Sequence, residues 1–273
     1  MRILVTGATG SLGQELCPML EREGWLFWAT NSKIFDITNT KMVNEIINKV
    51  SLDFIIHLAA YTNIDMAETH KQEAFKVNHI GTKNLARIAR KLDVPILYIS
   101  TDNVFDGKKD SPYKTDDSAN PLNVYGMSKL KGEEEILKTC KKYYIIRTGW
   151  LYGKGSKNYV DTMLTFSMLR REISVVNDQI GCPTWTKDLC EKIIDIMKNN
   201  KPYGTYHLCS SGQASWADFT KKIFEIKKRN VCVNAIDKSD FPRPAKRPHY
   251  CVLNNDNTLP DWEESLEKYL IGK

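Results

Sequence analysis

The chain begins with RILVTGATGSLG (residues 2–13), in which a short apolar run is followed by three glycines and the start of a helical pattern. Strand, glycine turn and helix in this order are typical of a dinucleotide-binding unit. Glycine lets the backbone approach a pyrophosphate, which then lies at the positive end of the helix. We therefore expect a dinucleotide to bind at Gly7, Thr9, Gly10, Ser11, Leu12 and Gly13. The spacing is G-x-x-G-x-x-G and not the commoner G-x-G-x-x-G, so a turn that only packs the helix on the strand is the alternative.

Apolar runs and helical patterns alternate beyond this unit. Strands are predicted at 25–29, 53–58, 95–100 and 143–147, with helices at 72–92 and 122–142. Such alternation favours an α/β fold, a Rossmann-type doubly wound parallel sheet with helices on both faces. After residue 150 the predicted elements are helices at 158–171, 186–199 and 215–229, strands at 173–176 and 203–209, a basic loop at 241–248 and a terminal helix from Trp262. We expect a dinucleotide-binding domain over 1–150 and a smaller, partly interleaved substrate-binding lobe over 151–273.

Composition excludes several classes of protein. The chain has 273 residues, 42% hydrophobic and 26% charged, which is ordinary for a globular protein. No apolar run reaches the roughly 20 residues that span a bilayer, and the N-terminus does not resemble a secretory signal. The net charge of +6 is spread along helices without a nucleic-acid-binding motif, so neither membrane nor nucleic acid is an expected partner. Seven scattered cysteines without C-x-x-C pairs predict reduced thiols in the cytoplasm and no zinc site.

Tyr125 and Lys129 lie four residues apart in the predicted helix 122–142, so they share one face. A tyrosine has a pKa of about 10, and a nearby ammonium lowers it toward the range useful for proton transfer. Packing and solvated surface are the commoner use of such a pair. The hydroxyl of Thr101, after Ser100 at the end of a predicted strand, can polarise a carbonyl together with the tyrosine. Glycine turn, hydroxyl and Y-x-x-x-K together predict nicotinamide-dependent carbonyl chemistry.

The second predicted strand indicates which cofactor is used. A carboxylate about 20 residues beyond the glycine turn commonly holds the ribose 2′-hydroxyl of NAD. Residues 30–33 contain Asn31, Ser32 and Lys33 but no carboxylate, so a 2′-phosphate is tolerated there. Asp36 follows and faces the adenine or ribose. NADP or NAD is therefore predicted, with a preference for NADPH.

Further blocks of sequence carry a resemblance to a known family. The chain resembles the extended short-chain dehydrogenases that act on nucleotide sugars, and within them the dTDP-4-dehydrorhamnose reductases. The resemblance covers nearly the whole chain. It rests on the glycine turn and on HLAAYT (57–62), VNxxGT (77–82), STDxVFxG (100–107), PLNVYGxSK (121–129), RTxWLYG (147–153), DQxGxPT (178–184) and LPDW (259–262).

This resemblance implies reduction of the C4 keto group of dTDP-4-dehydro-6-deoxy-L-mannose to dTDP-L-rhamnose. Tyr125 would donate the proton, Lys129 would hold the nicotinamide ribose, and Thr101 would tune the transfer. The cofactor would also be contacted by Asn31, Ser32, Asp36, Ile37, Leu58, Ala59, Ala60, Tyr61, Asn78 and Ser100. The dTDP-sugar would be contacted by Thr101, Asp102, Asn103, Trp150 and Arg247.

Several points stay open. Relatives often have tyrosine where this chain has Asn103, and some hold Mg²⁺ at a homodimer interface, where Glu15 and Asp188 occupy comparable positions. Arg243 and Arg247 either clamp a diphosphate or belong to a solvated loop. A dehydratase or epimerase on the same scaffold is one alternative, although Asn103 lacks the carboxylate that dehydratases use. A non-catalytic NADP-binding regulatory subunit is the other.

Overall fold

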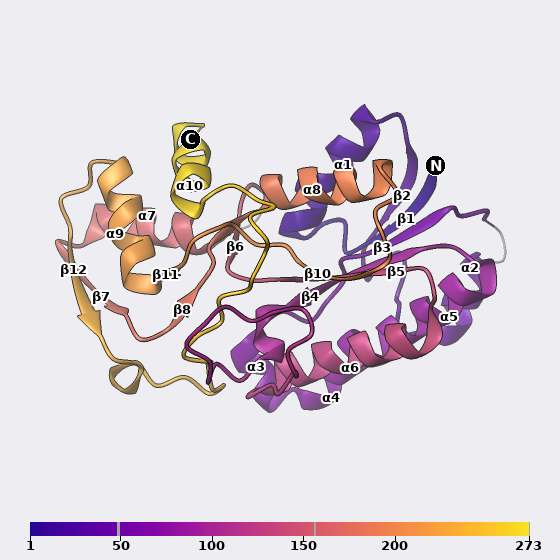
Figure 1. Ribbon diagram of the computed structural model, residues 1–273, viewed down its shortest axis with the longest axis horizontal. Helices are drawn as coiled ribbons and strands as arrows, with labels where there is room; N and C mark the ends of the chain where they lie inside the picture. Colours follow the sequence, from indigo (N-terminus) through magenta and orange to yellow (C-terminus); the bar gives the residue numbers. More distant parts are fainter. Residues whose placement is uncertain (48–49, 156, 273) are drawn as a thin grey trace.

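The structure is a computed structural model that describes residues 1–47, 50–155 and 157–272. Figure 1 shows a larger lobe, in which helices cover both faces of a sheet, and a smaller lobe beside it that contains α7, α9 and α10. The short strands β6, β8 and β11, which are not part of the large sheet, lie where the two lobes meet.

The large lobe is built on a six-stranded parallel sheet with the order β10-β5-β4-β3-β1-β2. Its strands are β1 (Arg2–Thr6), β2 (Leu26–Thr30), β3 (Phe54–His57), β4 (Ile96–Thr101), β5 (Tyr143–Thr148) and β10 (Gly204–His207). β2 lies on one side of β1 and β3 on the other, so the direction of winding reverses at β1. In such sheets the crevice beyond the carboxyl ends of the strands at this reversal binds ligands. The predicted doubly wound parallel sheet is confirmed.

Two layers of helices bury the faces of this sheet. α1 (Ser11–Arg22) packs with α8 (Thr186–Lys198) on one face through Leu12, Leu16, Leu189 and Ile193. The opposite face carries α2 (Thr40–Ile47), α3 (Ile64–Thr69), α4 (Lys71–Phe75), α5 (Thr82–Leu92) and α6 (Val124–Thr139) (Figure 1). The sequence analysis did not predict α2 or α3.

The prediction of one continuous helix at 72–92 is wrong for residues 76–81. Between α4 and α5 the backbone forms a π-helical segment, Lys76–Gly81. Thr82 donates its hydroxyl hydrogen to the carbonyl of Asn78 at 2.7 Å, and the buried His57 ring contacts the same hydroxyl at 3.0 Å. Such π segments occur frequently at functional sites. Here the segment carries Asn78.

The small lobe has its own aromatic core, which includes Tyr152, Phe219, Trp262 and Tyr269. Its elements are α7 (Tyr159–Leu169), α9 (Trp216–Ile226), α10 (Trp262–Ile271), the strand pair β7 (Glu172–Val176) and β12 (Cys232–Ile236), and the two-residue strands β6 (Leu151–Tyr152), β8 (Ile180–Gly181), β9 (Thr184–Trp185) and β11 (Ala214–Ser215). Two short 3-10 turns, Asp102–Val104 and Lys238–Asp240, complete the assignment.

The two lobes share the chain after residue 150. Both α8 and β10 come from this part of the sequence, yet α8 packs on α1 and β10 pairs with β5 in the large sheet. The division at residue 150 into a dinucleotide-binding domain and a partly interleaved substrate-binding lobe stays a prediction. No helix in the described ranges is both long and apolar enough to cross a membrane.

Candidate active site

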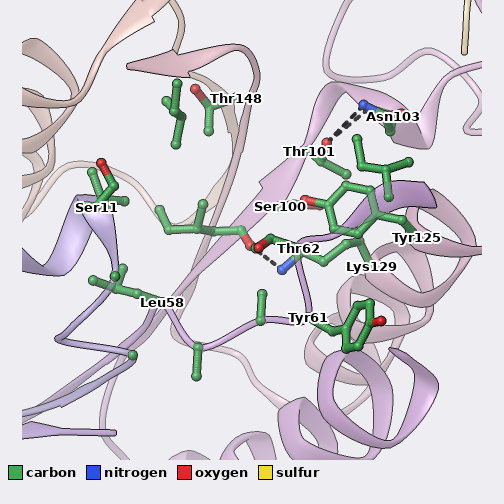
Figure 2. A pocket seen from close by; sticks show the side chains of 18 of the residues that line it. Ser11, Leu58, Tyr61, Thr62, Ser100, Thr101, Asn103, Tyr125, Lys129 and Thr148 are labelled. Carbon is green, nitrogen blue, oxygen red and sulfur yellow. Dashed lines mark hydrogen bonds between the residues drawn. The ribbon is translucent and has the colours of Figure 1, made fainter. Parts of the chain in front are cut away.

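A cavity of about 900 Å³ opens at the carboxyl edge of the sheet, and residues of both lobes line it. The large lobe contributes the turn after β1, the ends of β2 to β5, and α6. The small lobe contributes Trp216 and the segments around Gln179 and Arg247. Figure 2 shows Ser11 and Leu58 on one side of this cavity, Thr101, Asn103 and Tyr125 on the other, and Lys129 between them.

In the glycine turn, close packing of the backbone excludes a side chain at Gly7 and Gly13 but not at Gly10. Gly7 has a φ of +69°, and a Cβ there would lie 2.6 Å from the backbone nitrogen of Ala59. A Cβ at Gly13 would lie 2.5 Å from Ala8. A Cβ at Gly10 would contact the carbonyl of Gly7 at 3.3 Å. Of the three positions, Gly10 is therefore the one where packing within the fold least requires a glycine.

The start of α1 fits a pyrophosphate. The amide of Gln14 bonds to the carbonyl of Gly10 at 2.9 Å, and the amides before it belong to the first turn, where a helix has no carbonyl to offer them. These amides carry the positive end of the helix dipole toward the cavity side of the turn. Thr9, Gly10, Ser11 and Leu12 all line the cavity, as predicted for cofactor-binding residues.

Four further residues predicted to contact the cofactor also line the cavity: Asn31, Ser32, Asp36 and Ile37. Asn31 accepts hydrogen bonds from the amides of Lys33 and Ile34, and Asp36 accepts two from Thr38, so both side chains shape this wall. Lys33 is exposed and is not among the lining residues. The lysine on which the preference for a 2′-phosphate partly rested therefore lies outside the cavity.

Asn78 departs from its predicted role as a cofactor contact, because it is fully buried and does not line the cavity. Its side chain accepts a hydrogen bond from the amide of Tyr61 at 2.8 Å and donates to the carbonyl of Tyr61 at 3.0 Å and to Ser128 at 2.9 Å. Asn78 thus holds the segment Leu58 to Tyr61, whose four residues do line the cavity, against the catalytic helix.

Tyr125 lies in the first turn of α6, which Asn123 caps by accepting a hydrogen bond from the amide of Gly126 at 2.8 Å. Burial raises the pKa of Tyr125 to about 12, and the negative charge of Asp102 adds to this, while a hydrogen bond with Thr101 acts in the opposite direction. The predicted lowering of the pKa of Tyr125 by Lys129 is therefore wrong, because burial of the phenol dominates.

Lys129 is buried one turn further along α6. Its Nζ donates to the carbonyl of Ile99 at 2.6 Å and lies 4.0 Å from the ring centre of Tyr98. Burial lowers the pKa of Lys129 to about 7, and the nearby carboxylate of Glu133 partly opposes this. The ammonium is thus anchored on β4 at the floor of the cavity.

A buried ion pair between Arg147 and Glu133 lies next to the segment that carries Ser100 and Thr101. Arg147 donates from Nη2 to Glu133 at 2.8 Å and from Nε to both carboxylate oxygens at 3.1 and 3.3 Å. Ser100, which was predicted to contact the cofactor, donates its hydroxyl hydrogen to the same carboxylate. Ser100 nevertheless lines the cavity. Glu133 thereby fixes the end of β4 directly before Thr101.

Asp102 and Asn103 follow Thr101 in a short 3-10 turn. The carboxylate of Asp102 accepts from the Thr101 hydroxyl at 3.0 Å and from Asn103 Nδ2 at 2.9 Å. Burial raises the pKa of Asp102 to about 6, although these hydrogen bonds act against the shift. The amide oxygen of Asn103 accepts from Asn123 at 3.0 Å, so both ends of this side chain are bonded within the site.

The remaining predicted substrate residues, Trp150 and Arg247, also line the cavity. Trp150 has a φ of +51° and stacks on Trp216 of the small lobe, with ring centres 3.5 Å apart. Trp216 was not predicted, because no sequence pattern links the start of α9 to position 150. Thr148 was also missed. It pairs with Thr101 across β5 and β4, lines the cavity, and has a buried hydroxyl without a hydrogen-bond partner among the described residues.

No cluster of three or more His, Cys, Asp or Glu side chains suited to a metal exists in the described part of the chain. Of the two positions compared with magnesium ligands, Asp188 accepts a hydrogen bond from Ser265 at 2.5 Å, and burial raises its pKa. A magnesium site on this chain therefore has no support from the geometry.

Comparisons with known proteins identify the family. The family model of the RmlD substrate binding domain matches residues 1–271. The chain belongs to this family. The dTDP-4-dehydrorhamnose reductase of Sinorhizobium fredii is 36% identical over 285 residues, which cover 98% of this chain and 96% of that protein.

Two solved structures agree. A dTDP-4-dehydrorhamnose reductase from Clostridium acetobutylicum is 39% identical, with a TM-score of 0.96 over 99% of each chain. The Bacillus anthracis enzyme of the same name, in complex with NADP, is 38% identical with a TM-score of 0.96, covering 100% of this chain and 99% of that one. The resemblance to dTDP-4-dehydrorhamnose reductases is confirmed, whereas the roles of individual residues stay predictions.

Proposed function

We infer that this protein is an NAD(P)H-dependent oxidoreductase that reduces the C4 keto group of dTDP-4-dehydro-6-deoxy-L-mannose to give dTDP-L-rhamnose. One observation carries the inference. In a chain of this family, the open glycine turn, the Tyr125 phenol, the Thr101 hydroxyl and the Lys129 amine all meet in one cavity large enough for a dinucleotide and a sugar nucleotide. The amides of the glycine turn would hold the cofactor pyrophosphate, and Lys129 would hold the nicotinamide ribose.

When bound, reduced nicotinamide supplies a hydride to the C4 carbon. Tyr125 then donates its phenolic proton to the C4 oxygen, for which it must be protonated, and a pKa of about 12 keeps it protonated at neutral pH. The Thr101 hydroxyl, hydrogen-bonded to the phenol, stabilises the negative charge that develops on the tyrosine oxygen. This requires the single Thr101 hydrogen, which Asp102 accepts in the structure at 3.0 Å, to turn from Asp102 toward the tyrosine oxygen as the charge develops.

The alternatives make different use of position 103. Ring dehydration needs a base there, and Asn103 has an amide whose two ends are already hydrogen-bonded to Asp102 and Asn123. A non-catalytic NADP-binding subunit would not need Tyr125, Thr101 and Lys129 in one cavity.

Nicotinamide consumption tests the reductase. The purified protein should contain little bound nicotinamide and should oxidise one NADPH or NADH for each dTDP-4-dehydro-6-deoxy-L-mannose reduced, because a reductase exchanges its cofactor in each turnover. Conversion of the sugar nucleotide without a net change in nicotinamide absorbance would instead identify an epimerase or dehydratase. Absence of turnover despite NADP binding would favour the regulatory subunit.

Three finer proposals accompany the reaction. NADPH should serve at least as well as NADH, since residues 30–33 contain no carboxylate to repel a 2′-phosphate. The protein is proposed to act in the cytoplasm as a homodimer. Sedimentation velocity of the purified protein tests the homodimer.

A further inference from the structure

One carboxylate on the large lobe holds a basic loop of the small lobe. We call residues 241–248, FPRPAKRP, the arginine loop. Asp65 in α3 pairs with Arg243 Nε at 3.1 Å and with Arg247 Nη2 at 3.0 Å. The same side chain accepts a hydrogen bond from the amide of Ala245 at 3.3 Å. Asp65 therefore fixes the arginine loop at three of its residues.

A second anchor ties this loop to the catalytic helix. The carbonyl of Lys246 accepts a hydrogen bond from Asn123 Nδ2 at 2.9 Å, and Asn123 caps the helix that carries Tyr125. Glu68, one turn beyond Asp65 in α3, accepts from the amide of Val124 at 2.8 Å. α3 thus contacts both the arginine loop and the start of α6.

The two arginines have different surroundings. The Arg243 side chain is 47% exposed and does not line the cavity, whereas the Arg247 side chain is 17% exposed and does. Arg247 donates from Nη2 to Asp65 and from Nη1 to the carbonyl of Ala245 at 3.3 Å. These contacts use two of the five N–H donors of a guanidinium and set its plane. A guanidinium held in this way suits the oxygens of a phosphate.

We infer that Asp65 is a positioning residue for the substrate diphosphate, because it holds the arginine loop so that Arg247 faces the cavity. This inference rests on the proposed function, in which the substrate is a dTDP-sugar. It also predicts an effect on diphosphate binding that is opposite to the effect of the Asp65 charge alone. If Asp65 acted only as a negative charge near the diphosphate, its removal would tighten diphosphate binding. If it positions Arg247, its removal weakens binding, since the long side chain must then be ordered at the moment of association.

The test measures binding of dTDP and of thymidine by calorimetry, without turnover. Asp65→Ala should weaken dTDP binding by about tenfold, the scale expected for ordering a released side chain, while thymidine binding stays unchanged. Arg243→Ala is the matched control, because it removes the other partner of Asp65 and should change dTDP affinity by less than about twofold. In an Arg247→Ala background, Asp65→Ala should have no further effect.

Several results would overturn the inference. Unchanged or tighter dTDP binding by Asp65→Ala would show that Asp65 does not position Arg247, with the proposed reaction unaffected. Equal losses for dTDP and thymidine would indicate general damage to the lobe. An unaltered protein that binds no dTDP would refute both this inference and the proposed substrate. NADP affinity reports on the fold, and if Asp65→Ala does not fold, Asp65→Asn keeps an acceptor for Ala245 and should still weaken dTDP selectively.

Discussion

Replacement of Glu133 by alanine tests the buried ion pair that it forms with Arg147. The side chains of Glu133 and Arg147 are 1% and 8% exposed, and the carboxylate also accepts from Ser100. Removing one partner of a buried pair leaves the other charge uncompensated, which costs about 3–5 kcal/mol. A chain of this size loses roughly 2–4 °C in melting temperature for each kcal/mol. The expected fall for Glu133→Ala is therefore roughly 6–20 °C.

The assay is thermal unfolding followed by circular dichroism at neutral pH, with the neighbouring Glu134→Ala as control. Both substitutions exchange glutamate for alanine in the same helix, so changes in helix propensity cancel. Glu134 is 48% exposed and pairs with Lys131, in an arrangement typically worth less than about 1 kcal/mol. Its loss should lower the melting temperature by no more than about 4 °C. If Glu133→Ala melts within that same range, the pair does not carry the energy assigned to it.

Three further outcomes are expected. Tyr125→Phe should lower kcat by roughly 10²-fold or more with cofactor affinity unchanged, because only the transferable proton is lost; near-normal kcat would remove Tyr125 from the acid role. Gly10→Val should abolish NADP binding measured by calorimetry but shift the melting temperature little, since a Cβ there meets only the Gly7 carbonyl; retained affinity would make the turn purely structural. Lys129 has a pKa of about 7 in the folded protein against an ordinary value of 10.5. Between these pH values the unfolded chain therefore binds more protons than the folded one. The contribution of Lys129 to the free energy of unfolding should increase as the pH rises from 7 to 10.5. Urea unfolding should show this gain in the unaltered protein and lose it in Lys129→Met; identical pH dependence in both would contradict it.

The features that local sequence determines were predicted correctly. The spacing of Tyr125 and Lys129 fixes them on one face of a helix, and the glycine turn follows from a strand, three glycines and a helical pattern. The positions of the glycine turn and of the Tyr125–Lys129 pair along the chain also predict that both features lie at the carboxyl edge of the sheet. These inferences need only periodicity and the rules of parallel sheets.

The features that depend on burial or on distant contacts were not predictable. The pKa of Tyr125 rises because the phenol is buried, which no spacing of residues reveals. Asn78 lies in a π-helical segment, hydrogen-bonds to Tyr61 and does not line the cavity, and the helical periodicity of 72–92 indicates none of this. The contact between Asp65 and the arginine loop joins segments 180 residues apart, and neither segment carries a pattern that indicates the other.

The late position of α8 and β10 in the chain has a consequence for synthesis on the ribosome. Until residue 207 has emerged, β5 is the edge strand of the sheet, paired with β4 on one side only, and its other side can associate with other chains. The part of α1 that packs on α8 (Thr186–Lys198) likewise stays uncovered until α8 has been translated. The apolar face of α1 consists of Leu12, Leu16 and Leu20. The nucleotide-binding half therefore cannot mature by itself while the nascent chain is growing. It must remain incomplete, and exposed to chaperones or to neighbouring chains, until much of the small lobe has been translated.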